Sequence, residues 1–404
     1  MAVRGVIIGG SSGGLAVARE LRHHLGADRA LITVSATEPH FTFTPSLTRV
    51  ATGTRGVDQI SLDLAPALAS QQVGFVQQRV VTIDPDRKLG VIGQGEYPYD
   101  FLVIATGHRS ANEAVAGLGP FDGPGHSPML VTGAVELASA VRALIKEPGP
   151  VVVGAAPGAS CLGPSYELAF ELDHLLCRRK LRHRVPISFV TPEPFLGHMG
   201  MGGAGKIRQV LEGAFEKRDI SYPTSAAVTK ITESAVESRG SGPVPSILFI
   251  IVPPLAGVPV VAGTPRLANL KGFIPVDSHC RQSSLDGVYA VGVAVALAPV
   301  EETAVAVNFP KTGHMTEQMA LIAARDIVAR LEGHEGQTAE LSASCLLDMG
   351  DRGIYLAVDP VRPPRDRIPT VSEGRRWLLV KRAFERRNLW HARRGRSLPT
   401  SVGW

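Results

Sequence analysis

The sequence has few cysteines and aromatic residues, and it lacks any long apolar run. Four of its 404 residues are cysteine, and no two of them have Cys-x-x-Cys spacing. We therefore expect neither a metal site nor a disulfide framework. No run of 18 apolar residues free of breakers occurs, so no membrane-spanning helix is predicted. The most apolar run, Ile247 to Val252, ends in two prolines and favours a buried strand.

Basic charge is concentrated at the C-terminal end. Residues 361–404 contain 12 Lys or Arg against 3 Asp or Glu, whereas the whole chain has a net charge of +5, so the remainder is about −4. Nucleic-acid binding by the body of the protein is not expected. A strand beginning by Val3 leaves no room for a signal peptide, which predicts the cytoplasm or the cytoplasmic face of the membrane.

The N-terminal region has the pattern of a strand, a glycine-rich turn and a helix. An apolar strand over residues 3–8 leads into Gly9-Gly10-Ser11-Ser12-Gly13-Gly14, and residues 15–25 have helical spacing. A strand over residues 31–34 completes a βαβ unit, and the acidic residue Glu38 follows the end of this strand. Backbone N–H groups at the start of such a helix bind a pyrophosphate. The alternative is an ordinary βαβ crossover without a nucleotide.

Two later segments favour FAD as the nucleotide. A strand within residues 97–104 leads into Ala105-Thr106-Gly107, and a late strand ends at Gly292-Val293. The order of these segments resembles that in flavoproteins with two dinucleotide-binding domains. The predicted FAD-binding residues are Gly9, Ser11, Ser12, Gly13, Gly14, Glu38, Val80, Ala105, Thr106, Gly107, Gly292 and Val293.

A second strand-turn-helix pattern carries a cysteine where a nucleotide loop is expected. An apolar strand over residues 151–153 is followed by a turn in which Ala156 and Ala159 replace two glycines, and Cys161 precedes a helix that begins near Pro164. Because a helix N-terminus lowers the pKa of a thiol, this loop favours a thiolate. The sequence therefore predicts a flavoprotein whose electron donor reacts with sulfur, in place of one that accepts hydride from NADH.

These patterns predict an α/β fold with two Rossmann-like dinucleotide-binding domains, as in glutathione-reductase-like flavoproteins, and a C-terminal membrane-associating helical segment. Residues 1–110 and 272–333 are expected to form a discontinuous FAD-binding domain. Residues 111–271, inserted at the Pro/Gly-rich hinge 117–128, form the second domain, which carries Cys161. Residues 334–404 form a C-terminal segment.

A second cysteine, Cys345, lies far from Cys161 in the sequence. Two cysteines brought together beside a flavin can, when joined as a disulfide, accept two electrons from sulfide and hold the sulfur as a persulfide or polysulfide. For Cys177 and Cys280 the preferred interpretation is that of small buried apolar side chains.

Several segments together resemble the sulfide:quinone oxidoreductase family. They are Gly158 to Glu167 around Cys161, Phe195 to Gly200, Tyr289 to Val295, Pro310 to Gly313, and Cys345 to Gly350. The similarity follows the order of nearly the whole chain, including the tail.

The resemblance implies FAD as cofactor, sulfide as electron donor, a membrane quinone as acceptor and polysulfide as product. It also implies that the C-terminal region, residues 334–404, serves quinone binding and monotopic attachment to the membrane. It implies that Cys161 and Cys345 are the redox pair and that Glu167 and His198 handle protons. Lys311, just before a helix expected over residues 313–330, would lie near the flavin and stabilise its reduced anion. Structural roles for Glu167, His198 and Lys311 are the alternatives.

Two positions depart from the family pattern. Met129 lies where three-cysteine members have a further cysteine that attaches the flavin in some relatives, so non-covalent FAD is expected. Met349 replaces an aromatic residue after the second redox cysteine.

The basic tail is expected to form an interfacial helix over residues 377–390. Trp377, Val380, Phe384 and Trp390 would lie near one side, flanked by several arginines, which is the composition of a helix on an anionic bilayer. A helix docked on the protein's own core is the alternative. A homo-oligomer is compatible with this sequence.

Three other functions remain open from the sequence. A type II NADH:quinone dehydrogenase would need an intact second dinucleotide loop. A flavocytochrome c sulfide dehydrogenase flavoprotein subunit would normally be exported. A flavin-bearing redox sensor or sulfur carrier would use the thiols stoichiometrically, without turnover on quinone.

Overall fold

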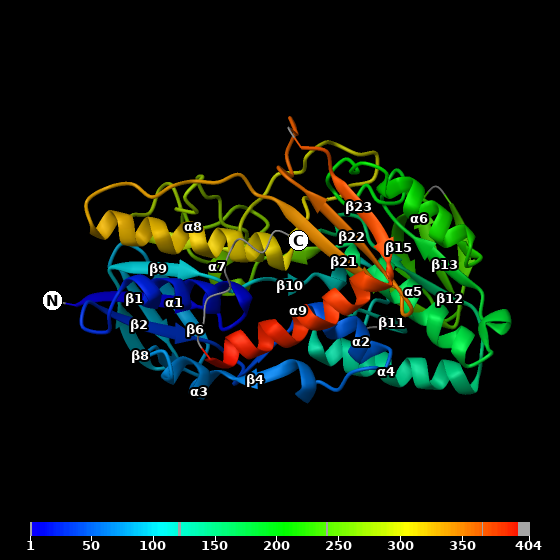
Figure 1. Cartoon of the computed structure of the whole chain (residues 1–404), viewed down its shortest axis with the longest axis horizontal. Coiled ribbons are helices and arrows are strands. Elements are labelled where there is room, and N and C mark those ends of the chain that lie inside the picture. The colour runs from blue at the N-terminus through cyan, green and yellow to red at the C-terminus, as the bar shows by residue number, and fades with distance from the viewer. Residues whose placement is uncertain (1, 120–122, 240, 366, 395–404) are drawn as a thin grey trace.

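A computed structural model describes residues 2–119, 123–239, 241–365 and 367–394. Two parallel sheets lie side by side along the long axis of the molecule, and helix α9 runs diagonally across the middle of the view in Figure 1. Residues 120–122 of the predicted hinge and the tail beyond residue 394 lie outside the described residues.

The first sheet joins the two ends of the predicted FAD-binding domain. Its parallel strands have the order β20 (Val288–Ala290), β9 (Phe101–Ile104), β1 (Val3–Ile8), β2 (Ala30–Ser35) and β5 (Gly74–Val76). Helix α1 (Ser12–His24) packs against α8 (Gly313–Leu331). The strand from the late segment therefore completes a sheet that the N-terminal residues begin.

The second sheet lies within residues 111–271. Its strands, again parallel, have the order β11 (Gly125–His126), β18 (Leu248–Val252), β12 (Val151–Ala155), β13 (Ile187–Val190) and β14 (Ile220–Ser221). Every residue of β12 and β18 is buried, because both faces of these central strands are covered. The predicted buried strand is confirmed for Leu248–Val252, whereas Ile247 lies before the strand and is exposed. Helix α5 (Gly163–Arg178) begins where the sequence predicts.

The C-terminal region forms an antiparallel sheet and the long helix α9 (Arg375–Arg394). The sheet consists of β21 (Ala343–Asp348), β22 (Gly353–Val358) and β23 (Thr370–Gly374), and it packs on α5. Among the described residues, no helix has both the length and the apolar character that crossing a bilayer requires.

The remaining elements are shorter or lie at the periphery. The helices are α2 (Leu47–Ala51), α3 (Leu64–Ala69), α4 (Val131–Lys146), α6 (Ile207–Glu216) and α7 (Pro259–Ala262). The strands are β3 (His40–Thr42), β4 (Ser61–Asp63), β6 (Val80–Asp84), β7 (Leu89–Ile92), β8 (Gly95–Pro98), β10 (Arg109–Ser110), β15 (Ala227–Ile231), β16 (Ala235–Arg239), β17 (Ser241–Pro245) and β19 (Leu255–Ala256).

Helix α9 corrects the predicted orientation of the tail aromatics. Trp377 stacks on Tyr355 of β22 with ring centroids 4.4 Å apart, and Phe384 packs edge-on against Phe43 at 5.7 Å. Neither ring belongs to an outward apolar face, because both fill gaps between α9 and the body. Leu379 and Trp390 are the large apolar side chains that α9 exposes.

Candidate functional site

The glycine-rich turn between β1 and α1 has the backbone that a pyrophosphate requires. Gly9 has a φ of +122°, and a Cβ placed on it would lie 2.2 Å from the carbonyl oxygen of Ala105. A Cβ on Gly14 would lie 1.8 Å from the oxygen of Gly9. Within the described chain, the Ser11 side chain makes no capping hydrogen bond and the first turn of α1 holds no acid. The helix N-terminus is therefore available to an anion.

The predicted segments converge on this turn. A Cβ on Gly13 would lie 3.1 Å from Thr316 of α8 and 3.2 Å from Val291 at the end of β20. At the end of β9, Thr106 Oγ1 and His108 Nε2 are buried and have no hydrogen-bond partner among the described residues. Burial, and then the charge of Lys311, lower the pKa of His108 to about 4. Orphaned polar atoms around a glycine cradle fit an extended polar cofactor such as FAD.

Two predicted FAD-binding residues lie farther from the turn. Glu38 is exposed beyond the end of β2, and Val80 is buried at the start of β6. Val293 lies in a short turn that begins at Gly292, whose φ is +69°. The binding roles of these residues stay predictions.

Lys311 joins the late FAD segment to the cysteine loop. Its Nζ donates to the carbonyl oxygen of Val293 at 2.9 Å and lies 3.4 Å from the centre of the Phe273 ring. Its backbone N–H donates to the oxygen of Ser160 at 3.2 Å, next to Cys161. Burial lowers the pKa of Lys311 to about 7. The cysteine loop and the end of the FAD segment are therefore neighbours.

Cys161 and Cys345 come together although 184 positions separate them in the numbering. Cys345 lies on β21, which packs on α5, and a Cβ built on Gly163 would lie 3.6 Å from the sulfur of Cys345. Both thiols are free and half-buried. The fold thus places the predicted redox pair at the start of one helix.

The predicted thiolate at Cys161 is wrong for the protein alone. Burial raises the pKa of Cys161 to about 11, and the negative charge of Glu167 raises it further. Burial likewise raises the pKa of Cys345 to about 12. Cys161 also lies two residues before α5 begins, so the helix N-terminus does not offset these two effects.

Glu167 lies beneath the cysteines at the centre of a buried ionic network. Its carboxylate pairs with Lys381 of α9 and accepts a 2.8 Å hydrogen bond from the backbone N–H of Asp348. Burial raises the pKa of Glu167, and Lys381 opposes that rise. The charge pair links the cysteine-bearing helix to the C-terminal helix.

The network extends through α2. The Thr48 hydroxyl lies 3.3 Å from Glu167 Oε2 and 3.2 Å from Glu171 Oε1, and Thr52 lies 2.9 Å from Glu171 Oε2. Burial raises the pKa of Glu171 to about 8, and the charges of Asp348 and Glu167 add to the rise. On the other side of α2, Glu385 of α9 binds Arg49, Arg55 and Ser46.

His198 lies in a different environment from Glu167. It is almost fully buried, and its Nε2 lies 2.7 Å from the exposed carboxylate of Glu301. Its Nδ1 accepts a 3.2 Å hydrogen bond from the backbone N–H of Gly200. Because Nδ1 accepts, Nε2 carries the proton and donates it to Glu301. The structure gives His198 no direct contact with either redox cysteine.

Sequence reasoning missed Lys381, Glu171 and Glu385. Lys381 and Glu385 lie four residues apart on a segment rich in arginine, where a solvated face is the ordinary interpretation. The structure buries both, because α9 docks this face on α2 and α5. No signal in the sequence marks that docking.

Comparisons with known proteins agree with this geometry. Residues 3–309 match the pyridine nucleotide-disulphide oxidoreductase family model. A sulfide-quinone reductase of Aquifex aeolicus is 35% identical over 99% of this chain and 93% of its own length. The chain belongs to the sulfide:quinone oxidoreductase family. The crystal structure of the Aquifex aeolicus sulfide:quinone oxidoreductase superposes with a TM-score of 0.94 over the same shares of both chains.

Membership of the sulfide:quinone oxidoreductase family confirms the predicted α/β fold with its dinucleotide-binding domains and C-terminal helix, and FAD as the cofactor. Association of that helix with a membrane stays a prediction. The glycine turn, the end of β9, the end of β20 and Lys311 would hold it, and it supplies a two-electron acceptor beside the thiols. A Plasmodium falciparum NDH2 in complex with NADH superposes with a TM-score of 0.74 over 98% of this chain and 96% of its own. At 13% identity this likeness shows the fold alone.

Proposed function

We propose that this protein oxidises sulfide to polysulfide at the Cys161/Cys345 pair and passes the electrons through FAD to a membrane quinone. One observation supports this assignment above all others: two free thiols from distant segments meet beside the predicted flavin site and above a buried carboxylate. The Aquifex relative, named a sulfide-quinone reductase, shares the architecture over nearly its whole length.

The sulfur chemistry balances with the groups present. When the cysteines are oxidised to a disulfide, hydrosulfide attacks one sulfur, forms a persulfide there and releases the other cysteine as a thiolate. Closing a trisulfide bridge then releases one proton and two electrons for each hydrosulfide consumed. Bound FAD would supply the two-electron acceptor, and Glu167, whose charge acts on Cys161, is the buried carboxylate that would take the proton. Repetition of this step lengthens the sulfur chain. When hydrosulfide has opened the bridge, the freed cysteine thiolate attacks the sulfur atom of the other cysteine, which expels the chain as polysulfide and restores the disulfide.

NADH is a poor fit as donor for this chain. Gly154, Ala156 and Ala159 line the second turn, and the space beyond it holds the cysteine loop, where Asn308 Nδ2 donates to the oxygen of Gly158 at 2.6 Å. A pyrophosphate would need the glycines that the alanines replace. This difference separates the chain from NADH:quinone dehydrogenases of the same fold.

The deciding experiment uses purified protein in mild detergent, with a flavin spectrum confirmed first. Sulfide or NADH is added anaerobically, followed by a short-chain quinone. We expect sulfide alone to bleach the flavin and catalytic turnover to follow on quinone. Bleaching by NADH and not by sulfide would instead identify the protein as a type II NADH:quinone dehydrogenase. Bleaching by sulfide without turnover on quinone would indicate a sensor or carrier.

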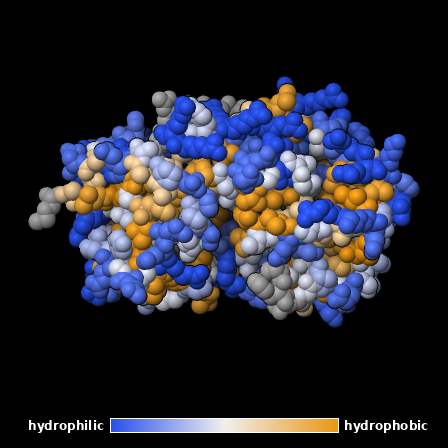
Figure 2. All heavy atoms as spheres, turned by 90° about the horizontal axis from the view of Figure 1, so that it is seen from below, coloured by the Kyte–Doolittle hydropathy of each residue, from blue (hydrophilic) through white to orange (hydrophobic). Residues whose placement is uncertain are grey.

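Helix α9 supports attachment to the cytoplasmic face of a membrane. Its exposed side carries Leu379 and Trp390 among seven arginines: Arg375, Arg376, Arg382, Arg386, Arg387, Arg393 and Arg394. Arginines beside an exposed tryptophan suit the headgroup region of an anionic bilayer. Seen from below, the surface in Figure 2 shows apolar patches separated by hydrophilic residues.

A further inference from the structure

The hydroxyl of Thr48 is shared between two buried carboxyl groups. Its oxygen lies 3.3 Å from Glu167 Oε2 and 3.2 Å from Glu171 Oε1, and both distances are within hydrogen-bond range. A threonine hydroxyl has one proton to donate and can otherwise only accept. Two ionised carboxylates, which only accept, cannot both be satisfied by it. One of the two carboxyl groups must therefore carry a proton and donate it to Thr48.

The neighbouring charges identify Glu171 as the protonated group. Glu167 has Lys381 as a partner and the Asp348 N–H as a donor. Glu171 has no ion-pair partner among the described residues, and Thr48 and Thr52 are the side chains that bind it. An ionised carboxylate buried without a cation is costly, so the proton resides on Glu171.

Counting the charges of the whole network gives the same result. Its acids are Glu167, Glu171, Asp348 and Glu385, and its cations are Arg49, Arg55 and Lys381. One proton on an acid leaves three negative charges against three positive charges. Burial raises the pKa of Glu171 to about 8, with Asp348 and Glu167 adding to the rise and Lys381 opposing it. The pKa and the geometry therefore agree.

We propose that Glu171 is a neutral carboxylic acid in the resting enzyme and relays the sulfide-derived proton from Glu167 towards the surface. This role rests on the proposed function. At rest Glu171 donates its proton from Oε1 to Thr48, and Thr52 donates to Glu171 Oε2 at 2.9 Å. In the relay the carboxyl proton turns from Oε1 to Oε2 and passes to Thr52, which releases its own hydroxyl proton. Oε1 can then accept the Thr48 proton, and Thr48 takes the sulfide-derived proton from Glu167 Oε2. The two oxygens of one carboxyl group thus face the incoming and the outgoing hydroxyl.

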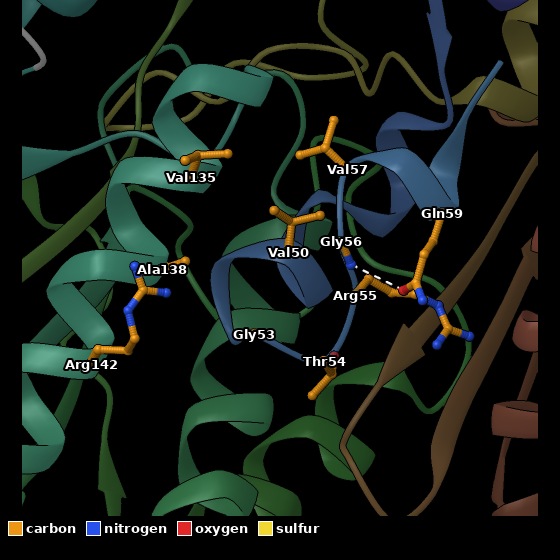
Figure 3. Close-up of a pocket in the computed structure, with 10 residues that line it drawn as sticks. All are labelled: Val50, Gly53, Thr54, Arg55, Gly56, Val57, Gln59, Val135, Ala138 and Arg142. Atoms are coloured by element: carbon orange, nitrogen blue, oxygen red, sulfur yellow. Dashed lines mark hydrogen bonds between the residues drawn. The ribbon is translucent and has the colours of Figure 1, made fainter.

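The outgoing end of the relay lies near an open cavity. Thr52 caps α2, and the next residue, Gly53, lines a cavity of 570 Å³ between α2, α4 and the loop that follows α2. Figure 3 shows Val50 and Thr54 on one side of this cavity and Val135 and Arg142 of α4 on the other. Solvent in this cavity, which the residue after Thr52 lines, is the proposed sink for a proton that leaves Thr52.

Infrared spectroscopy tests the protonated acid without any substrate. Spectra of the oxidised FAD enzyme are recorded across a pH titration for the wild type, Glu171→Gln, Thr48→Val and Glu20→Gln. Glu20 is a buried acid of α1 outside the network and serves as the matched control. At pH 7 we expect a carboxylic-acid C=O band in the spectra of the wild type, Thr48→Val and Glu20→Gln, and no such band in Glu171→Gln. The band should disappear as the pH rises through about 8.

Rapid mixing tests the relay. The FAD enzyme is mixed anaerobically with sulfide in the presence of a pH-indicator dye, so that proton release and flavin bleaching are followed together. We expect release to slow at least about tenfold in Glu171→Gln and Thr48→Val and to keep its wild-type rate in Glu20→Gln. Thr48→Val retains the infrared band while losing the proton link, which separates the relay from a structural effect.

Three outcomes would overturn the proposal. The first is a wild-type spectrum without the acid band, and the second is a band that persists in Glu171→Gln. The third is wild-type proton release in both relay variants. If sulfide fails to bleach the wild-type flavin, the proposed function and the relay are overturned together, whereas the infrared band still decides the protonation of Glu171.

Discussion

At the scale of single residues, the chemistry depends on two thiols whose surroundings keep them protonated. Burial and the nearby Glu167 raise the pKa of Cys161 to about 11, in place of the lowered value expected from the helix start. A buried thiol is a weak nucleophile. The oxidised pair, attacked by hydrosulfide, is therefore a better starting point for the reaction than a free thiolate.

Replacing either redox cysteine by serine should abolish reduction of the flavin by sulfide. In Cys161→Ser and in Cys345→Ser no disulfide can form, so hydrosulfide has no S–S bond to attack. We expect the anaerobic bleaching rate to fall at least about a hundredfold with unchanged FAD content. Cys177→Ser is the control, because Cys177 is exposed and lies at the far end of α5. A wild-type rate in either redox variant would remove that cysteine from the mechanism.

Glu171 should make stability depend on pH. Its pKa is about 8 in the folded protein against 4.5 as its ordinary value, so the folded state binds more protons between these values. Stability is full below this window and falls as the pH rises through it. Glutamine does not titrate, so Glu171→Gln does not lose stability in this way. The Tm of the variant relative to that of the wild type should therefore increase between about pH 5 and 8. Thermal unfolding measures the difference, and a constant gap would contradict the expectation.

At the scale of elements, α9 has two functions on opposite sides. Its inner side brings Lys381 and Glu385 into the buried network, and its outer side exposes arginines. Removing the helix would therefore uncover Glu167 and part of the core, and loss of membrane binding in such a truncation would be ambiguous. Substitutions on the outer side alone separate the two functions.

Charge reversal on the outer side of α9 should weaken binding to anionic vesicles. Arg382→Glu with Arg386→Glu changes two exposed residues and spares the buried contacts. We expect co-sedimentation with anionic vesicles to fall at least about tenfold and to weaken with added salt. Arg178→Glu with Arg179→Glu makes the same change of charge on exposed residues near the end of α5. Equal loss in both pairs would exclude a specific role for α9.

At the scale of the whole molecule, the FAD site joins segments from both ends of the chain. The turn after β1 meets Val291 and Thr316, and β20 pairs with β9. A cofactor bound there contacts residues that are far apart in the sequence, and it stabilises only the folded state.

Removal of FAD should lower the thermal stability of the whole protein. A ligand present at a thousand times its Kd stabilises the folded state by about 4 kcal/mol, which corresponds to several degrees in Tm. We expect deflavinated protein to melt earlier and added FAD to restore the original Tm, as followed by calorimetry. Identical melting curves would mean that the cofactor does not bridge these segments.

The sequence by itself determined the glycine turn, the Ala-Thr-Gly segment, the start of α5 and the two redox cysteines, because each is set by local spacing. Only the tertiary structure decided the pKa of Cys161, the burial of Lys381 and the sharing of Thr48 between Glu167 and Glu171. These properties depend on how α9, α2 and α5 pack against one another. Desolvation and long-range charge pairing act between segments hundreds of residues apart, and no local pattern records them.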